Sequence, residues 1–202
     1  MDYIAGTSGG LSPDLMVGLG RFRHQVFVEM LGWQLDARSE GLELDQFDRP
    51  DTVYVIARNE SGAVTGSARL LPTTRPYLLG DVFPQLLHDQ PVPESPAVWE
   101  LSRFAAVDFT AAKTSALPQY SSPVAVGLLR AAMRVAAERG AERLITVSPL
   151  GIERLLRRAG FHAHRAAPPI IVDGHPLFAA LIELDGSMVA HTPQVSPDIA
   201  AT

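Results

Sequence analysis

The stretch VWELSRFAAV, residues 98–107, decides the predicted fold and raises the first question about function. Its apolar and aromatic residues predict a buried β-strand, yet the run also carries a glutamate, a serine and an arginine. Because side chains alternate along a strand, we expect Glu100 and Ser102 on one face and Arg103 on the other. A charge inside a dry strand is costly unless it is paired, so both charged residues need partners from elsewhere in the chain.

The half of the chain before this strand predicts a helix followed by a hairpin. A helix is expected over about residues 13–31, because Ser12 and Pro13 form a start signal with a hydroxyl cap and Gly32 supplies a stop. Two β-rich runs, residues 52–58 and 63–71, flank the turn sequence NESG and predict an antiparallel hairpin. A short helix is expected around residues 81–88.

The half of the chain after this strand continues the alternation of helices and strands. Ser122 and Pro123 begin a strongly periodic helix that ends at Gly140. The remaining predicted elements are strands over 143–148, 161–166 and 177–184 and a helix over 150–160 that ends at Gly160. This order predicts an α/β fold with one mixed sheet flanked by helices, rather than a barrel of repeated βα units.

Length and composition predict a single domain over residues 1–202, with a mobile loop at about 33–51 and a frayed tail at about 186–202. The absence of cysteine excludes disulfides, thiolate metal sites and cysteine nucleophiles. The sequence shows no secretory leader pattern and no apolar run long enough to cross a bilayer, so we expect a cytoplasmic protein without a membrane partner. A net charge of −5 argues against a nucleic-acid partner.

Several charged residues are candidate partners for Glu100 and Arg103. Arginines occur in the first predicted helix and in the second hairpin strand, and acids occur in the loop between them: Arg23, Arg69, Glu43, Asp45 and Asp48. One interpretation is a set of structural ion pairs that fix the loop to the sheet. For Glu100 we favour another, in which the carboxylate accepts a proton from an amine nucleophile, directly or through a water.

Four segments in this order, RHQVFVEMLGW, LELDQFDRPDTVYVIA, GSARLLPTTRPYLL and VWELSRFAAV, resemble the acyl-homoserine-lactone synthase (autoinducer synthase) family. The resemblance extends from about Arg21 to Leu184. It implies a fold like that of the GNAT-like N-acetyltransferases and transfer of an acyl group from acyl carrier protein to S-adenosylmethionine. The products would be 5′-methylthioadenosine and an N-acyl-homoserine lactone, a quorum-sensing signal. The positions that recur in the family are matched here by Arg23, Phe27, Trp33, Asp45, Asp48, Arg69, Glu100, Ser102, Arg103 and Phe104.

The resemblance also implies roles for these residues. Glu100 would be the catalytic base, and Ser102 and Arg103 would complete the catalytic group by positioning the substrate and the loop. The remaining matched residues would bind S-adenosylmethionine or close the loop over it, with acids facing its amine or sulfonium and an arginine facing its carboxylate. Phe27 and Trp33 would form the pocket wall. No cofactor and no metal are expected, because a thioester and a sulfonium are already activated.

Two further sites follow from the family context. Ser148 and Leu150 are assigned to the acyl pocket; Ser148 stands where members that take 3-oxo chains tend to carry threonine, which favours an unsubstituted or 3-hydroxy chain of about eight carbons. Three arginines of the helix predicted over 150–160 are assigned to docking of the acidic carrier protein: Arg154, Arg157 and Arg158. A charged helix face of this kind is usually only solvated surface. His162 and His164 have metal-compatible spacing but are interpreted as surface residues.

Two alternatives remain open. A GNAT-type N-acyltransferase that uses acyl-CoA shares the fold, but YSSPVAVG, before the main helix, lacks the spaced glycines of a pyrophosphate loop. A non-catalytic ligand-binding module would keep the pocket without the chemistry. Activity alone separates both from a synthase.

Overall fold

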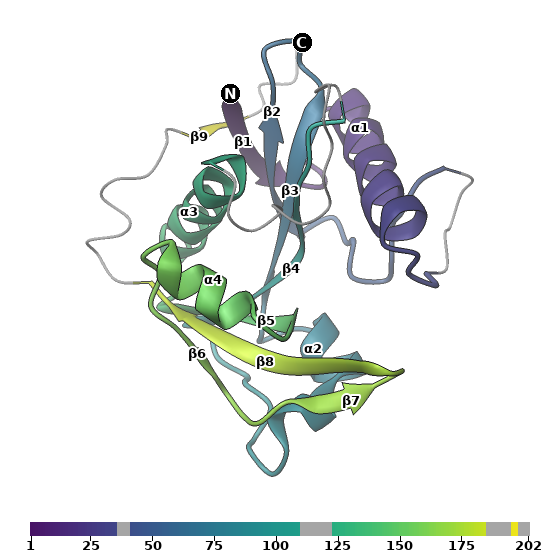
Figure 1. Cartoon of the computed structure of the whole chain (residues 1–202). Helices are drawn as coiled ribbons and strands as arrows, with labels where there is room; N and C mark the ends of the chain where they lie inside the picture. The colour runs from purple at the N-terminus through teal and green to yellow at the C-terminus, as the bar shows by residue number, and fades with distance from the viewer. Residues whose placement is uncertain (36–40, 110–122, 185–194, 198–202) are drawn as a thin grey trace. The chain divides into compact units, whose positions relative to one another are not determined.

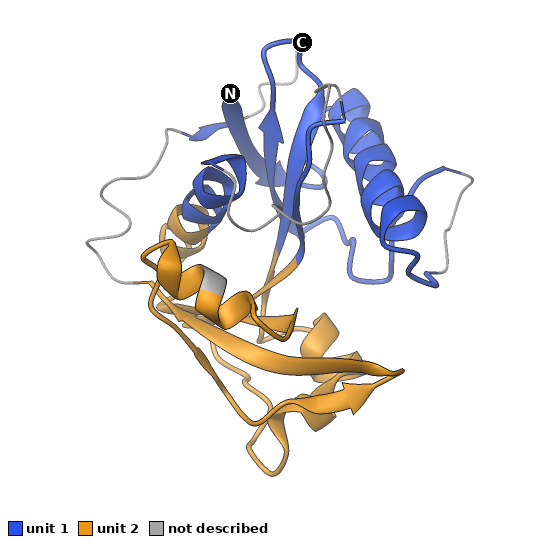
Figure 2. Ribbon diagram, viewed as in Figure 1, with its two compact units in different colours: residues 1–69, 103–132, 193–202 blue, residues 70–102, 133–192 orange. Residues whose placement is uncertain are grey.

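The computed structural model describes residues 1–35, 41–109, 123–184 and 195–197, which form two compact units (Figure 2). Unit 1 contains residues 1–69, 103–132 and 193–202, and unit 2 contains residues 70–102 and 133–192. Three elements contribute to both units: strand β3 (Val64–Pro72), strand β4 (Val98–Ala106) and helix α3 (Pro123–Ala137).

Unit 1 is built on strands in the order β9-β1-β2-β3-β4, with β1 at Asp2–Thr7, β2 at Val53–Arg58 and β9 at Val195–Pro197. β1 pairs with β2 antiparallel and with β9 parallel. Helix α1 (Pro13–Arg23) continues directly into a π-helix, η1 (His24–Met30). Figure 1 shows α1 and the first part of α3 on opposite sides of β1, β2 and β3.

Helix α1 buries one apolar stripe against the sheet of unit 1. Leu15 and Leu19 pack with Ile4 of β1 and Ile56 of β2. Phe22, in the last turn of α1, packs in a second cluster with Ala105 of β4. Burying a side chain of this size stabilises the fold by about 1.5–3 kcal/mol. The stripe therefore fixes the end of α1, from which Arg23 projects.

The opposite face of the unit 1 strands packs on α3 at a glycine. A Cβ on Gly127 would collide with the hydroxyl of Tyr3, a buried residue of β1. We expect Gly127→Ala to lower the free energy of unfolding by about 1–3 kcal/mol despite alanine's higher helix propensity, because an overpacked core must shift. Denaturant unfolding measures this difference.

Gly18→Ala on α1 is the matched control. Its Cβ would meet Val64 Cγ2 at 3.5 Å, an ordinary contact, so this variant gains up to about 1 kcal/mol from helix propensity. Equal effects of the two substitutions would contradict the packing of α3 on Tyr3.

Unit 2 has the strand order β3-β4-β5-β8-β6, and β7 also pairs with β8. β5 (Arg143–Pro149) is parallel to β4, whereas β8 (His175–Glu183) is antiparallel to β5, to β6 (Ala163–Arg165) and to β7 (Ile170–Val172). The helices are α2 (Leu78–Val82), the 3-10 helix η2 (Pro84–Leu87) and α4 (Ile152–Arg158). The predicted mixed sheet flanked by helices is therefore confirmed.

Several predicted boundaries need correction. The predicted 13–31 helix is α1 plus the π-helix, and the Ser12 side chain makes no capping hydrogen bond. The predicted helix at 81–88 begins earlier and is two elements, α2 and η2. β1, β7 and β9 were not predicted, and β9 lies within the expected frayed tail, most of which falls outside the described residues. Gly32, Gly140 and Gly160 do adopt the left-handed conformation that ends a helix.

The loop prediction for 33–51 is partly outside the described residues, and residues 41–51 form turns that hold the acidic side chains considered below. Across the described chain, no helix reaches the length and apolar content that crossing a membrane requires.

Candidate active site

Six ionised side chains of unit 1 form one charge network: Arg23 from the end of α1, Glu43, Asp45 and Asp48 from the loop before β2, Arg69 from β3, and Arg103 from β4. Three are cations and three are anions, so the network is neutral. All six are largely buried, and the side chain with the greatest exposure is that of Asp45, at 14%. The predicted pairing of loop acids with these arginines is thus seen.

Arg23 is fully engaged inside this network. Its Nε donates to Glu43 Oε2 at 2.5 Å, and its two terminal nitrogens donate to the two oxygens of Asp48 at 2.8 and 3.0 Å. Burial alone lowers the pKa of Arg23, but the charges of Asp48 and Glu43 outweigh it and raise that pKa above its ordinary value. For Arg23, structural ion pairing of the loop to α1 is therefore the supported interpretation.

Asp48 is also saturated. Its two oxygens accept hydrogen bonds from Arg23, from the Tyr54 hydroxyl at 2.6 Å and from the backbone N–H of Asp45 at 2.7 Å. Burial would raise the pKa of Asp48, yet the charges of Arg23 and Arg69 and the donated hydrogen bonds hold it well below its ordinary value. Asp48 thus serves the loop network, and its predicted contact with substrate stays a prediction.

Asp45 and Arg103 keep unused hydrogen-bonding capacity. Asp45 Oδ1 accepts from Phe47 N and Arg69 Nη1, at 2.8 and 2.6 Å, while Oδ2 accepts from Arg103 Nη2 at 2.9 Å. Arg103 also bonds Glu43 Oε1 through Nε and Nη2, at 3.1 and 3.0 Å. Within the described residues its Nη1 makes no hydrogen bond. A carboxylate oxygen and a guanidinium nitrogen are therefore available side by side.

An aromatic pair borders Arg103. Phe27 and Trp33 stack with centroids 4.9 Å apart, and the Arg103 guanidinium carbon lies 5.6 and 6.0 Å from their rings. The chain turns back after the π-helix at Gly32, whose φ is 68°, and the backbone N–H of Trp33 then donates to the carbonyl of Phe27 at 2.9 Å, which holds the two residues together. Trp33 is 45% exposed, whereas Phe27 is buried, so Trp33 presents the outer surface of the pair.

Arg103 reaches this position through an unusual backbone. Its φ of 49° is left-handed, which costs a non-glycine residue about 1–3 kcal/mol unless its surroundings fix it. The Ser67 hydroxyl donates to the Arg103 carbonyl at 3.0 Å and helps to fix it. The strand nevertheless continues through Arg103, since β4 runs from Val98 to Ala106 without a break.

Glu100 lies in unit 2 and is completely buried. Its Oε1 accepts the backbone N–H of Leu79 at 2.6 Å and its Oε2 accepts that of Leu78 at 3.1 Å, at the start of α2. The charge of Glu100 adds to burial in raising the pKa of nearby Tyr77, whose hydroxyl donates to the Pro93 carbonyl. The partners shown for Glu100 thus include backbone N–H groups, a kind of partner that the sequence did not predict.

The other predicted residues on β4 and β5 differ in burial. Ser102 and Ser148 are buried, and Phe104 is partly exposed. Leu150 follows β5 and is 47% exposed. The assignment of Ser148 and Leu150 to an acyl pocket stays a prediction.

The three arginines assigned to docking are exposed on α4 of unit 2, but they are not equivalent. Arg157 pairs with Glu153 at 2.7 Å and donates to the Ala163 carbonyl, and Arg165 binds the second oxygen of Glu153 at 2.7 Å. In the described part of the chain, Arg154 and Arg158 make no ion pair. They are one helical turn apart and carry the uncompensated charge of this face.

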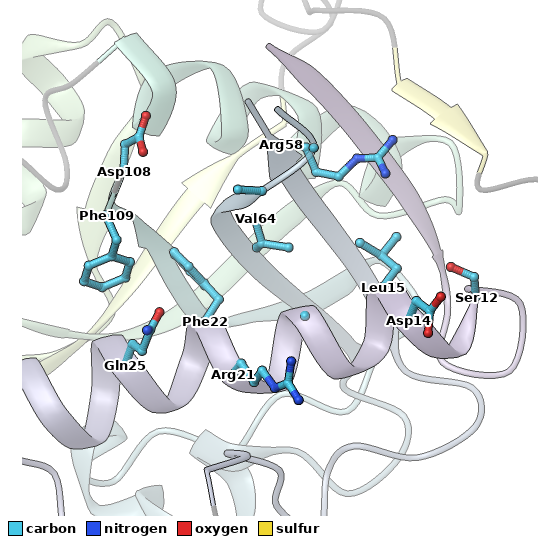
Figure 3. A pocket seen from close by; sticks show the side chains of 13 residues that line it. Ser12, Asp14, Leu15, Arg21, Phe22, Gln25, Arg58, Val64, Asp108 and Phe109 are labelled. Carbon is cyan, nitrogen blue, oxygen red and sulfur yellow. The ribbon is translucent and has the colours of Figure 1, made fainter. Parts of the chain in front are cut away.

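One cavity of unit 1 lies along α1 and does not include the charge network. It has a volume of about 540 Å³, and Phe22 and Phe109 in its lining pack edge to face (Figure 3). Among the described residues, no group of three or more histidine, cysteine, aspartate or glutamate residues is arranged to hold a metal ion. His162 and His164 are both exposed.

Two residues that sequence reasoning missed, one in β2 and one directly before it, support the acidic turn. Tyr54 binds Asp48, and Thr52 binds the backbone of the turn at Phe47 and Arg49. The available signal was a tyrosine in the otherwise apolar run VYVIA, because a buried phenol needs a hydrogen-bond acceptor.

Comparison with known proteins gives a consistent family. The family model for autoinducer synthases matches residues 14–191. The chain is 52% identical to an acyl-homoserine-lactone synthase of Acinetobacter nosocomialis, over 91% of this chain and 100% of that protein. It is 48% identical to an acyl-homoserine-lactone synthase of Ralstonia solanacearum, over 90% of this chain and 89% of that protein.

Solved structures agree with these relatives. TofI, in a complex with an inhibitor and MTA, superposes with a TM-score of 0.79 and 45% identity, covering 94% of this chain and 95% of that one. BjaI, a CoA-dependent acyl-homoserine lactone synthase with SAM and isopentyl-CoA, gives 0.83 and 25%, covering 100% and 95%. An acyl-CoA N-acyltransferase from Pseudomonas aeruginosa gives 0.59 at 16% identity, over 90% and 98%, which confirms the predicted GNAT-like fold.

Proposed function

Because the chain belongs to the autoinducer synthase family and is an acyl-homoserine-lactone synthase, an acyltransferase that makes quorum-sensing signals, we propose that it acylates S-adenosylmethionine and closes the lactone. The observation that carries the choice of substrate is the adjacent pair of Asp45 and Arg103, each with unused hydrogen-bonding capacity. An amino acid carries an amine and a carboxylate on one carbon, so a neighbouring acid and arginine match it group for group.

Asp45 Oδ2 would accept a hydrogen bond from the α-amine, and Arg103 Nη1 would donate to the α-carboxylate. The exposed side of Trp33 offers an aromatic surface to the sulfonium or the adenine. The ligands named for two relatives, SAM for BjaI and MTA for TofI, support this choice of substrate. Arg23, Arg69 and Asp48 would hold the loop that carries Asp45.

In the first step the neutral amine attacks the thioester carbonyl, an amide bond forms, and the carbon–sulfur bond of the thioester breaks. The sulfur leaves as a thiolate, which then takes up a proton to become the free thiol. We assign the amine proton to Glu100, directly or through a water, with Ser102 and Phe104 binding the substrate nearby on the same strand. The N–H groups of Leu78 and Leu79 keep the Glu100 carboxylate in one orientation.

In the second step the methionine carboxylate attacks the carbon beside the sulfonium. A carbon–oxygen bond forms, the carbon–sulfur bond breaks and 5′-methylthioadenosine leaves, so positioning supplies most of the catalysis. Neither step needs a metal or a redox cofactor.

The acyl donor we propose is an acyl carrier protein thioester with a medium-length chain near eight carbons, unsubstituted or 3-hydroxylated. Ser148, buried on β5, is the side chain assigned to the acyl chain. The exposed pair Arg154 and Arg158 would steer the acidic carrier, with Arg157 held back by Glu153. A CoA thioester is the alternative donor, because BjaI is CoA-dependent.

Charge reversal tests this docking surface. We expect the double variant Arg154→Glu/Arg158→Glu to raise KM for acyl carrier protein about tenfold at low salt and less at high salt, because the contacts are exposed and screened. The same variant with an acyl-CoA donor of equal chain length is the control and should keep its KM. Unchanged kinetics with the carrier at both salt concentrations would remove the surface from the proposal.

Mass spectrometry of the products tests the reaction itself. The protein, S-adenosylmethionine and a panel of acyl carrier protein and acyl-CoA thioesters should give an acyl-homoserine lactone and equimolar 5′-methylthioadenosine. S-adenosylhomocysteine, which lacks the sulfonium leaving group, should give no lactone. Absence of lactone with every donor would return the chain to the acyl-CoA N-acyltransferase or ligand-binding alternatives.

A further inference from the structure

Two hydroxyl groups on or beside β2 contact the acidic turn from behind. Thr52, which directly precedes the strand, and Tyr54, within it, are both completely buried. Neither side chain contacts Asp45 itself in any hydrogen bond shown for the described residues. Their contacts are with the residues that follow Asp45 in the turn.

Thr52 fixes the backbone of that turn. Its hydroxyl donates to the Phe47 carbonyl at 2.6 Å and accepts the backbone N–H of Arg49 at 2.9 Å. The Thr52 backbone N–H also donates to the Arg49 carbonyl at 3.0 Å. Three hydrogen bonds from one residue thus hold the chain just after Asp45.

Tyr54 is linked to Asp45 through the side chain of Asp48. Its hydroxyl donates to Asp48 Oδ1 at 2.6 Å, and Asp48 Oδ2 accepts the backbone N–H of Asp45 at 2.7 Å. Burial and the charge of Asp48 raise the pKa of Tyr54 above its ordinary value, so the phenol stays protonated and remains a donor. A continuous hydrogen-bonded path therefore leads from β2 to the backbone of Asp45.

We propose that Tyr54 and Thr52 are positioning residues that preorganise the acidic turn, so that Asp45 already faces the substrate amine before substrate binds. The proposal rests on the proposed function, in which Asp45 binds S-adenosylmethionine. A turn that must reorganise on binding costs affinity for that substrate alone, whereas the acyl donor is unaffected.

Kinetics of Tyr54→Phe and Thr52→Val test this. Each variant should raise KM for S-adenosylmethionine about 5- to 20-fold, since a hydrogen bond to a charged group or a turn backbone contributes on this scale. KM for the acyl donor at saturating S-adenosylmethionine should change less than about twofold. Calorimetric titration with S-adenosylmethionine alone should show the same loss of affinity without any turnover.

Thr73→Val is the matched control. Thr73 is also buried and directly follows β3 in unit 2, and its hydroxyl also bonds backbone, at the carbonyls of Ser95 and Val98. This variant should lower the melting temperature and leave both KM values unchanged. Thr52→Ser keeps the hydroxyl and should behave as wild type.

The outcomes distinguish failure of the positioning role from failure of the proposed function. If Tyr54→Phe and Thr52→Val lose stability as Thr73→Val does but keep the wild-type KM for S-adenosylmethionine, the positioning role is wrong. If Tyr54→Phe does not fold, the comparison of Thr52→Val with Thr52→Ser decides. Wild-type protein that neither binds nor converts S-adenosylmethionine would overturn the proposed function instead.

Discussion

Asp45→Asn is expected to abolish lactone synthesis while the protein stays folded. The asparagine carbonyl can replace Oδ1 as acceptor for Phe47 and Arg69, but its amide would face Arg103 Nη2, donor against donor. The substrate amine loses its anionic partner, and kcat/KM should fall about 100- to 1,000-fold. Steady-state kinetics with S-adenosylmethionine, together with circular dichroism, measure both parts of the prediction.

Asp48→Asn is the control that makes this result specific. Asp48 is also an aspartate of this turn, three residues away, yet it is saturated by Arg23, Tyr54 and backbone. Removing its charge leaves Arg23 buried and only partly compensated, which costs about 3–5 kcal/mol of stability. We therefore expect Asp48→Asn to unfold far below the wild-type melting temperature. An Asp45→Asn variant that unfolds likewise, or that turns over normally, would contradict the ligand-facing role of Asp45.

This contrast shows where sequence reasoning reaches its limit. The spacing of Asp45 and Asp48 and their match to the family predict both as substrate-binding residues, and the structure does bring both to Arg23, Arg69 and Arg103. Which acid retains a lone pair depends on the number of donors that converge on each carboxylate. Those donors include Tyr54 and backbone N–H groups, and no residue pattern predicts their number.

The fold followed the strength of the local signals. Strands β2, β3, β4, β5 and β8 are runs rich in β-branched or apolar residues, and all were predicted. β7 and β9 are three residues long and exist through pairing with β8 and β1, which local sequence does not encode. The π-helix was missed because seven residues of apolar periodicity are too few to distinguish a π-helix from an α-helix.

Arg103 illustrates a local rule that fails at the site itself. Local sequence predicted an ordinary extended residue here, whereas Arg103 has a left-handed φ of 49° within strand β4. A strained residue with its guanidinium beside two stacked aromatic rings is held by its surroundings, not by its own preference. Such positions are where function overrides propensity.

Glu100→Gln is expected to reduce kcat by about 100- to 10,000-fold, the usual contribution of a positioned base. The substitution also has a structural effect, because Glu100 accepts the N–H groups of both Leu78 and Leu79. A glutamine can accept only one of them, and its amide would face the other donor. That mismatch costs about 1–3 kcal/mol, so loss of activity alone does not prove a base.

A second substitution separates the two effects. Leu78 is the first residue of α2, where proline is tolerated, and Tyr77 before it has the extended backbone that precedes proline. Leu78→Pro removes the N–H at the longer contact, 3.1 Å, so Glu100→Gln/Leu78→Pro should recover most of the lost stability. Leu78→Pro alone shows the cost of the proline.

If Glu100 is the base, the double variant regains its melting temperature and stays inactive. Its low residual rate should rise with pH, because hydroxide then accepts the amine proton that Glu100 no longer takes. If activity returns together with stability, Glu100 serves only to fix the start of α2. The proton would then need another acceptor, while the binding roles of Asp45 and Arg103, which rest on separate contacts in unit 1, would be unaffected.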